Sequence, residues 1–188
     1  MKPLTDTEVK RLNREWRRRT TGRVALLLDG VQNPFNVGTI VRTAAAMRVE
    51  HLYLAAATSP SHPKVRKTAL GSERYLTWSE HETLAAALGA VRDDGLAVVG
   101  VELAPSATPL PAARLGAAVC FALGHEDRGL SAGCLTACDE IVYVPQLGRV
   151  GSLNVAQAAA IAVYEARRRE WAAPPEGPER SAGGDVDG

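Results

Sequence analysis

Polar side chains that could support chemistry collect in three loops, each of which follows an apolar run of strand length. The three segments are 29–42, 124–131 and 145–154, and a helical stretch follows each loop. In an open parallel sheet, loops that leave the carboxyl ends of strands line the ligand crevice. Each following helix also presents free N–H groups near that crevice. We therefore expect the three loops to form one site, although they lie far apart in the sequence.

Arg42 is the residue of these loops that a structural role explains least well. It lies in a helical stretch, residues 40–45, whose other members are apolar or small apart from Thr43. A buried arginine needs an anionic partner or a ligand. We therefore expect a functional role for Arg42 rather than a structural ion pair.

The other polar residues of the three loops also have structural explanations. Asn33 and Asn36 can be turn or N-cap residues, and Ser152 and Asn154 can cap the last helix. Glu126 is followed by charges that suit an ordinary surface loop. The sequence contains no dinucleotide-binding glycine motif after a strand, no phosphate-binding P-loop, no zinc-protease helix and no nucleophile elbow. The residues alone indicate an α/β domain with a three-loop site and a basic arm.

The elements that must position these loops alternate from residue 24 onward. The expected strands are 24–28, 51–54, 74–78, 96–101, 118–123 and 141–144. The expected helices are 37–47, 80–94, 131–138 and 153–170, with loop-rich segments at 55–73 and 104–116. Such alternation predicts an α/β fold with a mostly parallel sheet and helices on both faces.

Charge divides the chain into three expected parts. A basic N-terminal helical arm spans 1–21, one α/β domain spans 22–171, and a disordered, acidic tail spans 172–188. The formal net charge of +1 gives no overall polyanion-binding character, so any such character is local to the arm.

The arm itself is expected to be helical over about residues 5–20. Thr5 and Glu8 resemble a capping box at its start. Two interpretations of the arm stay open and are compatible. It is either a solvated helix docked by Trp16, or a segment that contacts phosphate groups.

Cysteine usage and hydropathy limit the class of protein further. Cys120 lies in an apolar run and is expected in the core, while Cys134 and Cys138 suit one helix face. No Cys or His pair completes a zinc site, so packing is favoured over metal binding. We expect no secretory leader and no membrane span, which fits the reducing cytoplasm.

Three segments resemble, in order, the motifs of the SpoU, or TrmH, branch of the SPOUT RNA 2′-O-methyltransferases. The first is 33–43 (Asn-Pro-Phe-Asn-Val-Gly-Thr-Ile-Val-Arg-Thr) and the second is 123–131 (Leu-Gly-His-Glu-Asp-Arg-Gly-Leu-Ser). The third is 144–156 (Val-Pro-Gln-Leu-Gly-Arg-Val-Gly-Ser-Leu-Asn-Val-Ala). Three motifs in order are highly specific, and the resemblance covers about residues 22–170.

The resemblance implies an α/β domain whose C-terminal part forms a deep trefoil knot, in a homodimer with its sites near the subunit interface. It also implies S-adenosylmethionine as cofactor, bent in the knot and held largely by backbone groups. The expected cofactor contacts are Gly124, Val144 and Leu153, with Val101, Leu123 and Leu147 nearby.

Carried over by position, the resemblance implies a catalytic set of Asn36, Arg42, Glu126, Ser152 and Asn154. In the family proposal the arginine is the general base, assisted by a substrate phosphate. Because a guanidinium is very hard to deprotonate, an alternative is that it stays cationic, binds the flanking phosphate and stabilises the developing alkoxide. The asparagines and the serine would orient the arginine and the ribose, and the glutamate would hold the loop geometry.

The sequence departs from the family pattern in places that could bear on substrate choice. Gln146 follows Pro145 where methionine is common, and Gln157 lies in the last helix where small residues dominate. The first loop carries Val37 and Gly38.

The short basic arm resembles that of relatives that methylate a D-loop guanosine of transfer RNA. We therefore expect tRNA guanosine 2′-O-methylation, with ribosomal RNA or a wobble-position tRNA ribose left open. The expected RNA contacts are Arg11, Arg14, Arg17, Arg18, Arg19, Lys64, Arg66 and Lys67. A non-catalytic RNA-binding protein of the same fold is the alternative, and the complete set of catalytic positions argues against it.

Overall fold

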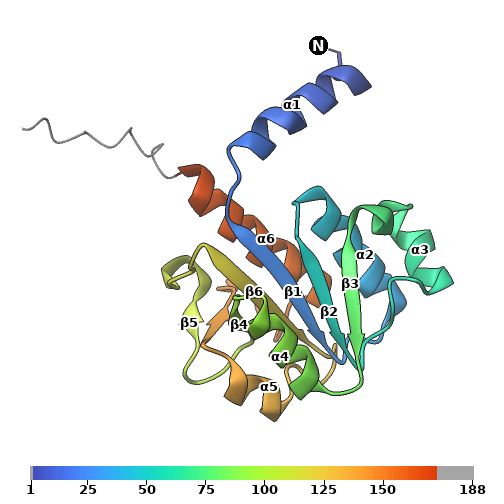
Figure 1. Ribbon diagram of the computed structural model, residues 1–188. Coiled ribbons are helices and arrows are strands. Elements are labelled where there is room, and N and C mark those ends of the chain that lie inside the picture. The colour runs from blue at the N-terminus through green and yellow to red at the C-terminus, as the bar shows by residue number, and fades with distance from the viewer. Residues whose placement is uncertain (1, 173–188) are drawn as a thin grey trace, which may run out of the picture.

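The computed structural model describes residues 2–172, whose strands form a seven-stranded sheet in the order β3-β2-β1-β6-β4-β7-β5 (Figure 1). All pairings between these strands are parallel, which confirms the predicted mostly parallel sheet. The strands are β1 Arg23–Asp29, β2 His51–Ala55, β3 Thr77–His81, β4 Ala97–Val101, β5 Thr108–Pro109, β6 Ala118–Gly124 and β7 Glu140–Tyr143. The helices are α1 Asp6–Arg18, α2 Pro34–Ala46, α3 Pro63–Ala69, α4 Leu84–Asp93, α5 Ala132–Ala137 and α6 Val155–Ala172, with short 3₁₀ helices η1 Ser72–Tyr75 and η2 Leu110–Ala112.

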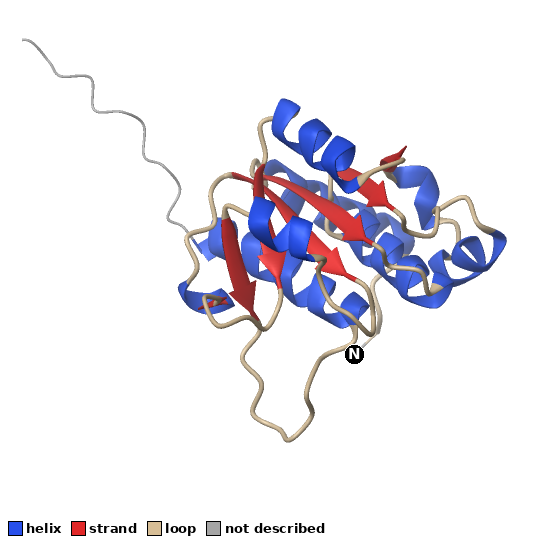
Figure 2. Cartoon of the chain, turned by 90° about the horizontal axis from the view of Figure 1, so that it is seen from below, coloured by secondary structure: helices blue, strands red, loops and turns tan. Residues whose placement is uncertain are grey.

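Helices cover both faces of the sheet because its central strands are apolar on both sides. Side chains alternate between faces along a strand, so Leu26 and Leu28 of β1 pack with α2, α3 and α6. Ala25 and Leu27 point to the other face and pack with α4 and α5. All four are fully buried, and each buried leucine contributes about 1.5–3 kcal/mol to folding. Figure 2 shows the two helical layers from below.

Three elements differ from the sequence-based expectation. The segment predicted as a loop at 55–73 contains α3, which begins at Pro63 after the N-cap His62. The predicted strand at 74–78 is replaced by η1 and by β3, which starts at Thr77. Helix α4 begins at Leu84 rather than near residue 80, because the side chain of Thr83 accepts a hydrogen bond from the amide of Ala86 at 3.1 Å.

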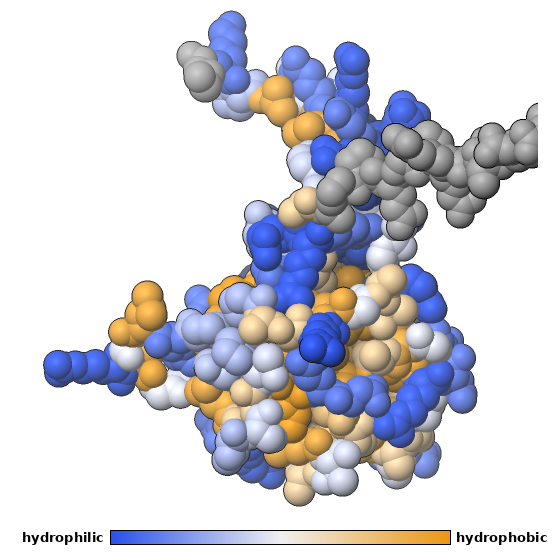
Figure 3. All heavy atoms as spheres, turned by 90° about the vertical axis from the view of Figure 1, so that its left-hand side faces the viewer, coloured by the Kyte–Doolittle hydropathy of each residue, from blue (hydrophilic) through white to orange (hydrophobic). Residues whose placement is uncertain are grey.

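The N-terminal arm forms the expected helix. The predicted capping box is present, with the amide of Thr5 donating to the carboxylate of Glu8 at 2.7 Å. No residue of α1 is buried, and Figure 3 shows apolar atoms among its charged side chains. The ring of Trp16 lies 5.0 Å from that of Trp171, so the arm is both solvated and docked at its C-terminal end. Figure 1 places α1 beyond the end of the sheet where the strands begin.

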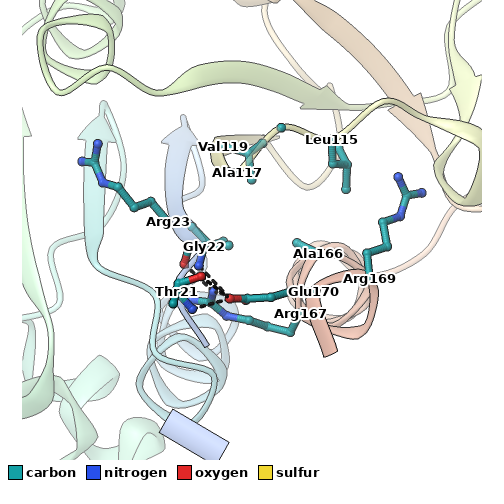
Figure 4. A pocket seen from close by; sticks show the side chains of 12 residues that line it. Thr21, Gly22, Arg23, Leu115, Ala117, Val119, Ala166, Arg167, Arg169 and Glu170 are labelled. Atoms are coloured by element: carbon teal, nitrogen blue, oxygen red, sulfur yellow. Dashed lines mark hydrogen bonds and ion pairs between the residues drawn. The ribbon is translucent and has the colours of Figure 1, made fainter. Parts of the chain in front are cut away.

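Arg167 anchors α6 at that same end of the sheet (Figure 4). Its side chain is 2% exposed and donates to the carbonyl oxygens of Met47 at 3.0 Å, Gly22 at 2.6 Å and Arg48 at 2.7 Å. Glu170, one turn further along α6, accepts from the amide of Gly22 at 2.8 Å. These bonds tie α6 to the start of β1 and to the C-terminal end of α2.

Candidate active site

The three loops meet at the carboxyl ends of the strands, as their positions in the sequence predict. The amide of Ser131 donates to the carboxylate of Asp29 at 2.8 Å, which joins the second loop to the first. The side-chain amide of Asn154 donates to Oδ1 of Asn36 at 2.9 Å, which joins the third loop to the first. Hydrogen bonds across about 100 residues of sequence therefore bring the loops into one site.

Glu126 is the centre of this arrangement. Its carboxylate accepts from the side-chain amide of Asn36 at 3.0 Å and from the backbone amides of Asn33 at 3.0 Å and Gln32 at 3.4 Å. Burial alone would raise the pKa of Glu126, but the bond from Asn36 and the backbone bonds outweigh it and lower the pKa. At neutral pH Glu126 is thus an anion that holds the first loop against the second.

The asparagines divide into structural and site roles. Asn33 is the N-cap of α2 and accepts from the amide of Phe35 at 2.9 Å, as its structural explanation predicts. Asn36 lies inside the helix and connects Glu126 to Asn154 through its two amide atoms. The Oδ1 atom of Asn154 accepts from the amide of Ala156 at 2.9 Å, so this residue both caps α6 and joins the network.

Arg42 contradicts the expectation that it is buried. It is exposed, and none of the hydrogen bonds or ion pairs among residues 2–172 involves its side chain. The buried residues of α2 include Ile40, Val41 and Ala44, which turn position 42 toward solvent. Because an α-helix has 3.6 residues per turn, Arg42 shares the exposed face with Phe35 rather than the inner face with Asn36. The structure therefore brings three of the predicted catalytic positions, Asn36, Glu126 and Asn154, together and leaves Arg42 apart from them.

A pocket lies at the ends of β4 and β7, beside the network. Three of the predicted cofactor contacts, Val101, Val144 and Leu153, line it together with Ser152. The other lining residues are Glu102, Leu103, Tyr143, Gln146 and Ala158. The lining is mostly apolar, and the side-chain Oε1 atom of Gln146 is buried with no hydrogen-bond partner among the described residues. The pocket thus combines an apolar lining with the hydroxyls of Tyr143 and Ser152.

The remaining predicted cofactor contacts lie elsewhere. Leu123 is buried in β6 and Gly124 ends that strand. A side chain at Gly124 would lie only 2.1 Å from the backbone of Gly129, so the tight turn of the second loop is itself a reason for a glycine. Leu147 is fully exposed on the loop between β7 and α6, which projects from the domain in Figure 2.

Glu102 is a site residue that lies outside all three predicted loops. Its carboxylate accepts from the amides of Leu103 at 3.0 Å and Leu130 at 2.9 Å, so it holds the second loop against the end of β4. Gly129 adopts a positive φ of 67° beside it. A signal for Glu102 exists in the sequence, because it directly follows an apolar strand, as the residues of the three loops do.

The predicted RNA-contacting side chains are all exposed, in two groups. Those of the arm lie at the amino ends of the strands, at the opposite end of the sheet from the network. The cations at 64, 66 and 67 lie on α3, which packs beside α2, and Arg66 is 3.6 Å from Glu73. Across residues 2–172 there is no cluster of three or more potential metal ligands. In the same range, no helix has the length and hydropathy of a membrane span.

A parallel α/β sheet with an anion-stabilised network and an apolar pocket at its carboxyl edge defines a ligand-binding α/β domain. Residues 23–164 match the model of the SpoU rRNA Methylase family, so the chain belongs to this family.

Relatives of the chain are named as RNA methyltransferases. It is 38% identical over 153 residues to an uncharacterised tRNA/rRNA methyltransferase of Synechocystis sp., covering 80% of this chain and 55% of the relative. It is 36% identical to the 23S rRNA (guanosine-2′-O-)-methyltransferase RlmB of Acinetobacter baylyi, covering 77% and 59%. The chain therefore spans less than two thirds of the length of these relatives.

Solved structures share the fold. The SpoU methyltransferase AviRb of Streptomyces viridochromogenes in complex with AdoMet matches with a TM-score of 0.73 and 26% identity, over 79% of this chain and 61% of that one. A structure described as giving insights into the 2-OH methylation of C/U34 on tRNA matches with a TM-score of 0.70 and 31% identity. That match covers 79% of this chain and 97% of the other.

Proposed function

We propose that this protein is an S-adenosylmethionine-dependent RNA methyltransferase that modifies a ribose 2′-hydroxyl. The observation that carries the proposal is the hydrogen-bonded network of Glu126, Asn36 and Asn154 beside the pocket of Val101, Val144 and Leu153. The second interpretation, a non-catalytic RNA-binding protein, gives no reason for such a network next to a small-molecule pocket.

The residues of the pocket fit the cofactor. Apolar side chains such as Val101, Leu103 and Val144 can enclose a flat base, and the hydroxyls of Tyr143 and Ser152 in the same lining can form hydrogen bonds. Backbone groups of Val144 and Leu153 would hold the rest of the molecule, as the resemblance implies, and Gly124, Leu123 and Leu147 belong to the same proposed set. When bound, S-adenosylmethionine supplies an electrophilic methyl group.

The side chains of the site position the acceptor and stabilise its charge. Asn36 and Asn154 are fixed by Glu126, so their amides can orient a ribose with little further ordering. Ser152 lies at the pocket and is exposed, where it can contact the ribose. A guanidinium keeps its proton in proteins, so we assign Arg42 to phosphate binding and stabilisation of the developing alkoxide rather than to proton removal.

Completion of the site by a second copy would explain the separation of Arg42 from the network. The exposed face of α2 carries Phe35, Thr39 and Arg42, and the adjacent α6 exposes Ile161 and Tyr164. Large exposed apolar side chains beside a cation suit a subunit interface. We propose a homodimer in which this combined face of α2 and α6 lies at the interface.

The proposed deep trefoil knot is supported by the order of the strands. β7 lies between β4 and β5, and α6 then returns to pack against α2 and β6. Knots are very rare in proteins, so this part of the proposal comes from the family rather than from general topology rules.

For the substrate we propose a tRNA guanosine of the D-loop, and the cytoplasm as the place of the reaction. The basic arm and the absence of any other basic segment of similar size from the described residues support a compact RNA. The relatives act on both classes of RNA by name, so ribosomal RNA and the tRNA wobble ribose are the alternatives that the experiment must separate.

Transfer of label from radioactive S-adenosylmethionine to purified tRNA and to ribosomal RNA tests the proposal directly. We expect methylated tRNA, with 2′-O-methylguanosine found by mass spectrometry of its nucleosides. Labelling of ribosomal RNA alone would reassign the substrate. Binding of RNA without any binding of S-adenosylmethionine in calorimetry would contradict the enzyme and support the non-catalytic protein.

A further inference from the structure

A groove lies between the basic arm and the α/β domain. It has a volume of about 860 Å³ and is found where α1 faces the C-terminal end of α2 (Figure 1). Apolar residues line much of it, namely Ala45, Ala46, Met47 and Val49. Clefts of about 300–1,000 Å³ hold small molecules, so this one can admit a nucleotide. Of the RNA contacts expected from the sequence only Arg17 lines the groove, which is therefore a different surface from the one predicted.

The charged side chains that line the groove are all cations. Lys10 and Arg17 come from α1, and Arg48 follows the end of α2. The ion pairs found among residues 2–172 involve none of the three. Nη1 of Arg48 donates to the carbonyl oxygens of Arg17 at 3.3 Å and Thr20 at 3.0 Å, which fixes this cation beside the arm. Cations without neighbouring carboxylates complement phosphate groups.

Tyr75 of η1 supplies an aromatic ring to the same groove. The side chain is 69% exposed, and the guanidinium of Arg74 lies 4.8 Å from the centre of its ring. Trp16 also lines the groove, but its ring packs against Trp171 at 5.0 Å and against the guanidinium of Arg19 at 4.7 Å. The ring of Trp16 is thus engaged in docking the arm, and Tyr75 is the ring that a ligand can reach.

We propose that the groove binds an unpaired nucleotide of the RNA, with its base stacked on Tyr75 and the adjacent phosphates held by the three cations. An accessible aromatic ring beside unpaired cations suits single-stranded nucleic acid, because every base has a face that can stack. A base inside a duplex is already stacked on its neighbours and cannot reach the ring. The inference rests on the proposed function in taking RNA as the ligand. It adds that the substrate carries an unpaired nucleotide near the arm, at the other end of α2 from Asn36.

Fluorescence anisotropy with a labelled RNA of mixed sequence and about ten nucleotides, alone and annealed to its complement, tests the stacking. We expect Tyr75→Ala to bind the single strand about five- to 150-fold more weakly than the wild type, which is the loss of one stacked base. Its affinity for the duplex should stay unchanged. Tyr75→Phe keeps the ring and should bind both as the wild type does. The matched control is Leu70→Ala, at a side chain that is also 69% exposed but lies outside the groove.

The salt dependence of binding separates the ring from the cations. Stacking releases no counterions, so Tyr75→Ala should weaken binding of the single strand by the same factor at every salt concentration. Replacement of Lys10 and Arg17 by glutamine should instead reduce the slope of log K against log salt, by about 0.7 for each phosphate group that is no longer neutralised.

Three results would overturn the inference. The first is equal affinity of the wild type and Tyr75→Ala for the single strand. The second is an equal loss in Tyr75→Ala and Tyr75→Phe, which would replace stacking by a contact of the hydroxyl. The third is a lower mass of Tyr75→Ala than of the wild type in sedimentation without RNA, which would assign the groove to an interface between copies of this chain.

The binding measurements contain no S-adenosylmethionine, so their outcome is distinct from that of the methyl-transfer assay. If RNA binds through Tyr75 but receives no methyl group, the inference stands and the methyltransferase proposal falls. If RNA is methylated and Tyr75→Ala binds it like the wild type, the methyltransferase proposal stands and the inference falls. If the wild type binds no RNA, both fail.

Discussion

At the scale of single residues, the exposed guanidinium of Arg42 has no protein partner among the described residues, although it follows the first loop of the site by only a few positions. Its charge is thus available to a phosphate. The side chains of Glu126, Asn36 and Asn154, in contrast, already satisfy one another. The proposed function therefore assigns charge stabilisation to Arg42, and assigns loop geometry and orientation of the ribose to the network.

This division leads to a prediction for Arg42→Ala. We expect the variant to bind S-adenosylmethionine as the wild type does and to lose about 10²–10³ in kcat, the usual effect of removing one group that stabilises charge in the transition state. Calorimetry and single-turnover methyl transfer measure the two quantities. Arg114→Ala, an exposed arginine outside the three loops, is the matched control. Wild-type turnover in Arg42→Ala would remove Arg42 from the mechanism.

Glu126 should show its role in the pH dependence of stability. Its pKa in the folded protein lies below the ordinary value of 4.5, so its contribution is complete above about pH 5 and disappears as the pH falls through the lowered pKa. We expect Glu126→Gln to lower the free energy of unfolding at pH 7 by about 1–3 kcal/mol, as measured by chemical denaturation. The difference from the wild type should shrink below pH 4.5. A difference that stays constant under further acidification would show that the charge of Glu126 does not hold the loops.

At the scale of elements, the packing of α2 against α3 depends on one small residue. A Cβ atom at Gly38 would lie 2.5 Å from Cβ of Thr68 and 2.9 Å from the carbonyl oxygen of Val65. Glycine at this position therefore lets α3 pack closely against the helix that carries Asn36 and Arg42. The positions of α2 and of the cationic α3 are coupled through this close approach.

Two glycine-to-alanine exchanges test the coupling. Gly38→Ala should destabilise the protein by about 1–3 kcal/mol, because the added methyl group overpacks a closed interface. Gly89→Ala is the control in α4, where a Cβ would meet nothing within 4 Å. It should stabilise by about 0.5–1 kcal/mol through helix propensity. Chemical denaturation measures both, and equal effects of the same sign would contradict close packing at Gly38.

Elements that depend on local patterns can be predicted from the sequence, and those that depend on tertiary packing cannot. The apolar run in β1 and the cap at Thr5 lie in the sequence itself, and both are confirmed. The seven-residue α3 has the signature of a loop, because its proline and cations carry no apolar period. Arg167, Arg168 and Arg169 look alike in sequence, yet only Arg167 is buried. Arg167 is selected by the carbonyl groups of Gly22, Met47 and Arg48, which lie just before β1 and just after α2 and which no local pattern reveals.

The candidate site, like the fold, could be predicted from the sequence only in part. The meeting of the three loops follows from a general property of parallel sheets, and the hydrogen bonds of Glu126 and Asn154 confirm it. The exposure of Arg42 could not be predicted because its neighbours in sequence are apolar, and small residues such as Ala45 do not reveal which helix face is inward. Glu102 belongs to none of the three motifs, and its one signal, a position directly after an apolar strand, is weak by itself.

At the scale of the whole molecule, the charge of the arm should supply affinity for RNA. Arg11, Arg14 and Arg18 are exposed, so replacing them with glutamine should leave the fold intact. We expect weaker RNA binding, and a slope of log K against log salt that is smaller by about 0.7–0.9 for each phosphate group that the arm no longer neutralises. Binding at several salt concentrations measures the slope. Unchanged binding and slope would reduce the arm to a structural helix.

These substitutions are preferable to deletion of the arm. Thr20 is buried, and its hydroxyl accepts a hydrogen bond from the indole of Trp171 at 2.9 Å. Deletion would therefore disturb the C-terminal end of α6 together with the charge, whereas the three substitutions change the charge alone.

The proposed dimer gives a further prediction at this scale. Tyr164→Asp places a charge on the exposed face of α6, so we expect the variant to sediment as a monomer and to lose methyl transfer. Leu70→Asp, at an exposed apolar position on the end of α3, is the control and should keep the wild-type mass. A dimer of wild-type activity carrying Tyr164→Asp would move the interface away from this face.

The position of α1 has a consequence for which RNA molecules the protein accepts. The arm and the network around Glu126 lie at opposite ends of the sheet, separated by about the length of α2, about 20 Å for its 13 residues. Within one subunit, a fragment too short to bridge that span can engage the arm or the network but not both. Such a fragment lacks the added affinity that arises when binding at one site raises the effective concentration at a second, linked site. The domain would therefore bind folded RNA that is long enough to contact both sites more tightly than short oligonucleotides with the same target nucleotide.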